Sequence, residues 1–162
     1  MIQKAVIAIF FLSLTCAQAL AAVSIERDVS LTDDQGGSMQ LTTTGQANAA
    51  GSDSVTMAIF DNFQGVQNNR TVNGEVVRNR SRGDGEVETR YSGILEISSS
   101  TGPDGPITLN VLEFDALAVN RSGDGPKLSG LITFNGETLD AAELSEPQLR
   151  LLRRTLRFFR FA

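Results

Sequence analysis

Alternation of apolar and polar residues with a period of two is the feature that most restricts the fold of this chain. In the segment "EVETRYSGILEIS", Val87, Tyr91, Leu95 and Ile97 share one side, and charged or small polar residues occupy the other, with only Ile94 out of phase. Because successive side chains of a strand point to opposite faces of a sheet, this segment is predicted to be a half-buried antiparallel strand.

The same alternation recurs in three more segments. Their apolar positions are Val23, Ile25, Val29 and Leu31 in "VSIERDVSL", Val55, Met57 and Ile59 in "SVTMAIF", and Ile107, Leu109 and Val111 in "ITLNVLEFDALAV". The last segment shifts phase near Leu112 and Phe114, which indicates a β-bulge or a short helix. Turn-forming stretches such as "DDQGG", "AAGSDS", "TGPDGP" and "FNGE" separate the runs. Short strands at this spacing predict a mainly β fold, either an antiparallel β-sandwich or a small barrel.

Two of the turns belong to a duplicated hairpin. The segment "NRSRGDGEVETRYSGILEIS" from Asn79 is echoed by "NRSGDGPKLSGLITFN" from Asn120, an offset of 41 residues. The first copy contains Arg82-Gly83-Asp84, a tripeptide that cell-adhesion receptors bind, but the second copy keeps only the Asp-Gly pair. Asp-Gly favours the positive φ angles of tight hairpin turns, so we interpret the motif as a turn and not as an adhesion ligand.

The N-terminal segment "MIQKAVIAIFFLSLTCAQALAAV" has the layout of a secretory signal peptide. Lys4 precedes an apolar run, and small residues follow it up to an A-x-A site at Ala19-Leu20-Ala21. We therefore expect residues 1–21 to be removed, and the mature protein to be periplasmic or secreted. The apolar run is too short to span a membrane as a helix.

The catalytic inventory of the chain is small. It has no histidine, and its one cysteine, Cys16, falls within the expected signal peptide. This excludes Ser-His-Asp and Cys-His nucleophile systems and His-ligated zinc. A carboxylate pair could still act as acid and base, although sugar clefts are usually lined by Trp and Tyr, and this chain has no Trp and one Tyr. Asp84, Glu86 and Glu88 fit no calcium-loop signature. No catalytic, cofactor-binding or metal-ligating residue is predicted.

The C-terminal segment "LSEPQLRLLRRTLRFFRFA" breaks the β pattern. Ser145 is placed as an N-cap, Pro147 falls in the first turn, and Gln148 stands at the capping-box position. Leu144 and Leu149 are placed as a hydrophobic staple. These signals predict an antiparallel β domain over residues 22–142 and a basic amphipathic helix over residues 143–162.

Arginines occupy one side of this predicted helix. At 100° per residue they fall within an arc of about 120°, and they are Arg150, Arg153, Arg154, Arg157 and Arg160. Leucines and phenylalanines fill the opposite half: Leu149, Leu151, Leu152, Leu156, Phe158 and Phe159. Only Phe161 lies on the wrong side.

Charge divides the chain into an acidic body and a basic end. Residues 22–144 contain eight basic and eighteen acidic residues, a net charge of −10, whereas residues 145–162 contain five basic and one acidic, a net charge of +4. In one interpretation the apolar half of the helix docks on the β domain and its arginines are solvated or paired with acids. In the other, the arginines meet an anionic membrane surface or a partner protein. No nucleic-acid partner is expected for an exported acidic chain.

These observations predict an exported, non-enzymatic binding or structural module of the periplasm or cell envelope, which binds a protein partner or forms a homo-oligomer. The alternative is a peripheral membrane-associated protein that uses the arginine-rich helix. A carboxylate-based enzyme is the third interpretation.

Overall fold

The computed structural model describes residues 22–64, 70–100, 105–122 and 125–161, and only the backbone is described at 125, 160 and 161. The expected signal peptide, residues 1–21, lies outside the described residues. The strands are β1 (Val23–Thr32), β2 (Ser38–Ala47), β3 (Gly51–Phe63), β4 (Arg70–Gly83), β5 (Glu86–Ser100), β6 (Ile107–Ser122), β7 (Gly125–Phe134) and β8 (Glu137–Asp140). A short turn η1 (Ala141–Glu143), the helix α1 (Glu146–Thr155) and the 3-10 turn η2 (Leu156–Phe161) follow.

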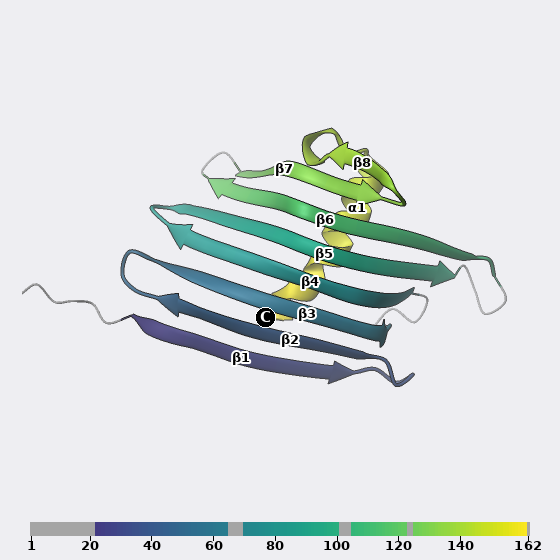
Figure 1. Ribbon diagram of the computed structural model, residues 1–162, viewed down its shortest axis with the longest axis horizontal. Helices are drawn as coiled ribbons and strands as arrows, with labels where there is room; N and C mark the ends of the chain where they lie inside the picture. Colours follow the sequence, from purple (N-terminus) through teal and green to yellow (C-terminus); the bar gives the residue numbers. More distant parts are fainter. Residues whose placement is uncertain (1–21, 65–69, 101–104, 123–124, 162) are drawn as a thin grey trace, which may run out of the picture.

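The eight strands form one open antiparallel sheet in which spatial order equals sequence order (Figure 1). The predicted mainly β fold with a C-terminal helix is therefore confirmed. A sandwich or a closed barrel is not confirmed, because each described strand pairs only with its neighbours in sequence, and β1 and β8 are the edges. The helix supplies the cover that a second sheet would supply in a sandwich.

One face of the sheet, here called the inner face, carries the core. In Figure 1 the strands lie in front of α1 and η2, which cross behind them from β7 towards β3. The core combines side chains of β2 to β7 with Leu144, Leu152 and Phe159 from the C-terminal segment. The opposite face, here called the outer face, is turned towards the viewer and has no described element over it.

The alternation predicted for β5 is confirmed, since Tyr91, Leu95 and Ile97 are buried while Ile94 is 48% exposed. The prediction for β3 has the right period and the wrong side. Val55, Met57 and Ile59 are 41–45% exposed on the outer face; Thr56, Ala58 and Phe60 are the buried residues.

The same error occurs in β6, where Ile107 and Leu109 are 75% and 54% exposed while Leu112 and Phe114 are buried. Both strands carry apolar side chains on both faces. Periodicity then indicates a strand without indicating which side meets the core.

A crease crosses the sheet through residues with positive φ. Their angles are 49° at Asn62 in β3, 116° at Gly74 in β4, 131° at Gly93 in β5, 54° at Ala116 in β6 and 93° at Gly130 in β7. Strand register shifts beside three of them, between Phe60 and Phe63, between Tyr91 and Gly93, and between Asp115 and Ala118. The predicted irregularity in β6 is thus a bulge, a few residues later than expected. Bulges and glycine kinks are the devices that make a sheet curve.

The duplicated hairpins are β4–β5 and β6–β7. In the first, Asp84 and Gly85 have φ angles of 50° and 80°, which confirms the turn predicted for the Asp-Gly pair. In the second, the turn residues 123–124 lie outside the described residues, although Ser122 pairs with Gly125 beside them.

The helix begins as its sequence predicts. The backbone N–H and the hydroxyl of Ser145 both donate to the Oε1 atom of Gln148, at 2.9 and 2.6 Å. The helix is α-helical to Thr155 and tightens into the 3-10 turn η2. Within the described ranges, no helix has the length and apolar character needed to cross a membrane.

Candidate functional site

The apolar side of α1 and η2 is fixed to the inner face of the sheet. Leu152 and Phe159 are 1% and 3% exposed. The Phe158 ring packs edge-on against Phe60, with 5.2 Å between the ring centroids, and Phe159 packs in the same manner against Tyr91 at 5.4 Å. The helix therefore docks on its own β domain, as in the first of the two interpretations of its charge pattern.

A buried arginine joins this helix end to the sheet. Arg78 in β4 is 8% exposed; its Nη1 donates to the backbone carbonyl of Phe159 at 2.8 Å and its Nη2 to the hydroxyl of Thr56 at 2.9 Å. Its guanidinium carbon also lies 5.4 Å from the centroid of the Phe159 ring. The hydroxyl of Thr56 lies 3.0 Å from that of Thr43, so a short polar chain runs through the core across β2, β3 and β4.

Burial shifts the pKa of two side chains in this cluster. Desolvation lowers the pKa of Arg78 and raises the pKa of its neighbour Tyr91. The Nε atom of Arg78 is buried without a hydrogen-bond partner among the described residues. The cluster is packed between sheet and helix, and the two Nη atoms of Arg78 bind groups of the chain itself.

The arginines of the helix lie on the side away from the sheet. Arg150, Arg153, Arg154 and Arg157 are all exposed, while only the backbone of Arg160 is described. The Nε atom of Arg150 lies 3.9 Å from a carboxylate oxygen of Glu146, with both side chains more than 60% exposed. Arg153, Arg154 and Arg157 have no ion pair with any residue in the described part of the chain. The structure thus leaves these four arginine side chains exposed to solvent.

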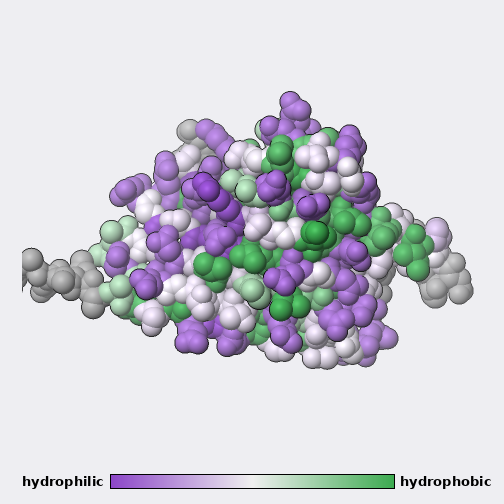
Figure 2. Space-filling model, viewed as in Figure 1, coloured by the Kyte–Doolittle hydropathy of each residue, from purple (hydrophilic) through white to green (hydrophobic). Residues whose placement is uncertain are grey.

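The outer face carries exposed aliphatic side chains on four strands, β3, β5, β6 and β7. We call them the outer patch, and its members are Val55, Met57, Ile59, Ile94, Ile107, Leu109 and Leu131. Figure 2 shows hydrophobic residues gathered over the middle of this face between polar ones. Exposed apolar side chains that gather on one face between polar residues are common at interaction sites.

Carboxylates alternate with these aliphatic side chains. Strand register places Ile59 beside Glu75, Glu75 beside Ile94 and Ile94 beside Glu113, in one row from β3 to β6. Glu96 lies two residues beyond Ile94 on the same side of β5. Glu75, Glu96 and Glu113 are exposed, and the described residues offer them no ion pair. The outer patch is therefore set in acidic surroundings.

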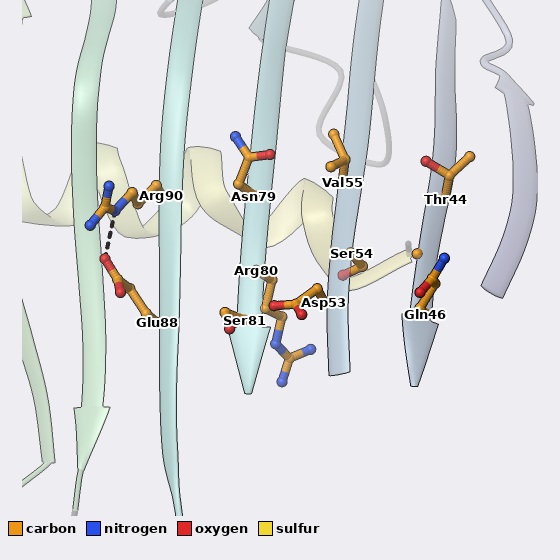
Figure 3. A pocket seen from close by; sticks show the side chains of 11 residues that line it. Thr44, Gln46, Asp53, Ser54, Val55, Asn79, Arg80, Ser81, Glu88 and Arg90 are labelled. Carbon is orange, nitrogen blue, oxygen red and sulfur yellow. Dashed lines mark hydrogen bonds and ion pairs between the residues drawn. The ribbon is translucent and has the colours of Figure 1, made fainter. Parts of the chain in front are cut away.

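An open groove of about 660 Å³ lies beside the outer patch, at the end of the sheet that carries the β4–β5 turn (Figure 3). Residues of β2, β3, β4 and β5 line it: Thr44, Gly45, Gln46, Asp53, Ser54, Val55, Asn79, Arg80, Ser81, Glu88 and Arg90. Arg90 donates from Nε to Glu88 at 2.5 Å, as the dashed line in Figure 3 shows. The lining combines two carboxylates, two guanidinium groups and small polar side chains.

The two carboxylates of this groove differ in their contacts. Asp53 and Glu88 are its carboxylates, but Asp53 is exposed and Glu88 is bound to Arg90. In the ranges that the structure describes, no group of three or more acidic, His or Cys side chains is placed to hold a metal ion.

Sequence reasoning found the arginine face and missed both the outer patch and Arg78. A signal for the outer patch was present, since "SVTMAIF" has apolar residues at adjacent positions and therefore on both faces. Arg78 is separated from the buried residues Val72 and Val76 by an even number of positions, so its side chain lies on the same face of β4. The alternation thus placed a charged residue at a core position.

Comparison with known proteins adds no relative: no family model, no curated protein and no solved structure matches the chain.

Proposed function

We propose that this protein is an exported, non-enzymatic binding module of the periplasm or cell envelope, and that its outer sheet face is the binding surface. The observation that carries this proposal is the outer patch. The inner face already has its cover in α1 and η2, yet Met57, Ile59 and Ile94 remain 41–48% exposed on the other side. Because these side chains are already more than half buried, covering the exposed remainder of each is worth about 1 kcal/mol, so a partner that covers several of them gains a few kcal/mol.

A direct test places a photo-crosslinking amino acid at Ile59 or Ile94 in living cells. We expect discrete adducts from both positions. The matched control is Gln35, an exposed residue of the β1–β2 turn away from the patch, which should give none of them. Equal labelling from Gln35, or no adduct from either patch position, would contradict the proposal.

Export is tested separately by mass spectrometry of the fractionated cells. The charged, apolar and small-residue zones at the start of the chain lead us to expect a mature N-terminus at or within a residue or two of Ala22. Soluble mature protein that retains Met1 would contradict this part of the proposal.

Membrane association through the arginine face is the second candidate. Four exposed guanidinium groups on one side of α1 and η2 favour it. However, interfacial helices insert their apolar face into the headgroup region, and here that face packs on the sheet. Binding would then be electrostatic only, so co-sedimentation with anionic vesicles should fall steeply as salt rises.

A further inference from the structure

We infer that the partner of the outer face is a second copy of this chain, with the arginine face of one copy packed on the outer face of the next. This inference rests on the proposed function, because it names the occupant of the same surface. Charge complementarity is its first support. Each molecule presents exposed guanidinium groups on one side and exposed carboxylates among aliphatic side chains on the opposite side of the sheet.

Spacing is the second support. Arg150 and Arg157 lie on the same side of the helix, and the rise per residue puts them about 10–12 Å apart along the axis. Glu75 in β4 and Glu113 in β6 are separated by one intervening strand, and strand spacing puts them about 9.5 Å apart. Figure 1 shows the helix running across the strands from β7 towards β3, so in copies that stack without rotation the arginine row and the carboxylate row both cross the strands.

Stacked copies would also bury the outer patch. The aliphatic stems of the arginines cover apolar surface while their charged ends reach carboxylates, and Ile94 lies directly between Glu75 and Glu113. The contact joins two different surfaces, so it repeats from copy to copy and produces an open chain of subunits unless the rotation closes a ring.

Salt at physiological ionic strength screens the repulsion between the acidic bodies of two copies. The acidic body repels another copy at long range, but the Debye length at 0.15 M salt is about 8 Å. Local pairing between the arginine face and the carboxylates then outweighs repulsion between distant charges. The association should therefore persist at moderate salt and weaken near 1 M salt, where the Debye length is about 3 Å.

Pairing through the open edge of β1 is a poorer mode of self-association. In an antiparallel pair of β1 strands centred on Arg27, that residue would face its own copy, and Glu26 would face Asp28 of the other chain. Like charges directly opposite each other destabilise a strand pair. The centre of β1 is thus protected in the way that natural edge strands are.

Reciprocal charge reversal tests the inference. One variant, the outer-face variant, carries Glu75→Lys, Glu96→Lys and Glu113→Lys. The other, the helix variant, carries Arg153→Glu, Arg154→Glu and Arg157→Glu; Arg150 stays, because reversal there would repel Glu146 in the same helix. Circular dichroism and melting curves establish that both variants keep the fold.

We expect the wild type to form oligomers in sedimentation velocity at 0.15 M salt, and each variant alone to be monomeric. An equimolar mixture of the two variants should recover oligomers, because each reversed surface then meets its complement on the other chain. Recovery in the mixture is a result that loss of folding cannot imitate. A photo-crosslinker at Ile59 should give adducts between two copies of the chain.

Three results would overturn the inference: a monomeric wild type, a variant that still self-associates, or a mixture that stays monomeric. Binding of the wild type to anionic vesicles, abolished in the helix variant, would assign the arginine face to a membrane instead. If Ile59 gives adducts only with a different protein, the second copy is refuted and the proposed function stands. If neither Ile59 nor Ile94 gives an adduct, both are refuted.

Discussion

The guanidinium group of Arg78 donates a hydrogen bond to the backbone carbonyl of Phe159, 81 residues further along the chain, at 2.8 Å. Carbonyl groups at the C-terminal end of a helix lack partners inside the helix and carry partial negative charge. Arg78 supplies a buried cation at the point where this end of the helix needs one. This hydrogen bond joins η2 to β4, in the middle of the sheet.

Replacing Arg78 with Ala should destabilise the protein by about 2–4 kcal/mol, because the Phe159 carbonyl and the Thr56 hydroxyl lose their buried donor and a cavity remains. Urea denaturation followed by circular dichroism measures this. Arg80→Ala, at an exposed position two residues away, is the matched control and should change the free energy of unfolding by less than about 0.5 kcal/mol. Similar losses in the two variants would show that the Arg78 contacts contribute little.

Tyr91 should make stability fall at alkaline pH. Its pKa is raised by burial in the folded state above the unfolded value near 10, so folding favours the neutral ring. The stabilisation is complete below about pH 10 and is lost as pH rises through the raised folded pKa. Since the chain has a single tyrosine, the ultraviolet absorbance of tyrosinate reports this group alone.

We expect the titration midpoint of native protein to lie above that of urea-unfolded protein. Tyr91→Phe should flatten the alkaline decline in stability. Coincident midpoints in the two states would mean that solvent reaches the ring in the native protein.

Gly93 should be intolerant of any side chain. A Cβ atom there would lie 2.2 Å from the carbonyl oxygen of Glu75, at a φ of 131°. Gly93→Ala is therefore expected to cost at least about 2 kcal/mol, through strain and displacement of β4. Gly85→Ala is the control, because φ is 80° there but no atom lies within 4 Å of the added Cβ. Its cost should be about 1–2 kcal/mol, so thermal melting should rank Gly93→Ala as the less stable protein.

Leu152→Ala should show that the sheet depends on its helix. This side chain is 1% exposed, and removal of a buried leucine typically costs about 2–5 kcal/mol. Leu131→Ala removes the same atoms from the outer patch, where the residue is 46% exposed, and should cost less than about 1 kcal/mol. Urea denaturation of both variants compares the two faces directly. A larger loss for Leu131→Ala would contradict the assignment of inner and outer faces.

Local signals explain what could be predicted from the sequence. The hydrogen bonds between Ser145 and Gln148 span three residues, and the positive φ angles of Asp84 and Gly85 belong to adjacent ones. The alternation in β5 is likewise contained in one strand. Each of these features depends on residues that are neighbours in the chain. The helix start, the hairpin turn and the strand could therefore be predicted from the sequence.

Features that depend on contacts between distant residues could not be predicted from the sequence. Val55 and Phe60 lie in one strand with apolar residues on both sides, and the helix packs on the side of Phe60. The partner of Arg78 is 81 residues away and is a backbone carbonyl, which has no sequence signature. Alternation is also the same in a sandwich, a barrel and an open sheet, because closure depends on whether the first and last strands meet.

The sequential order of the strands allows the sheet to form in the order in which the chain emerges, N-terminal end first. Chain emerging from the N-terminal side can add one hairpin at a time, from β1 to β8, using only pairs between consecutive strands. The apolar inner face grows with each addition, whereas α1 and η2, which cover it, follow the strands in the chain and emerge after them. A chain that has completed its sheet therefore exposes the most apolar surface just before Leu152 and Phe159 emerge. Chaperones that bind apolar surface should bind it best at that stage.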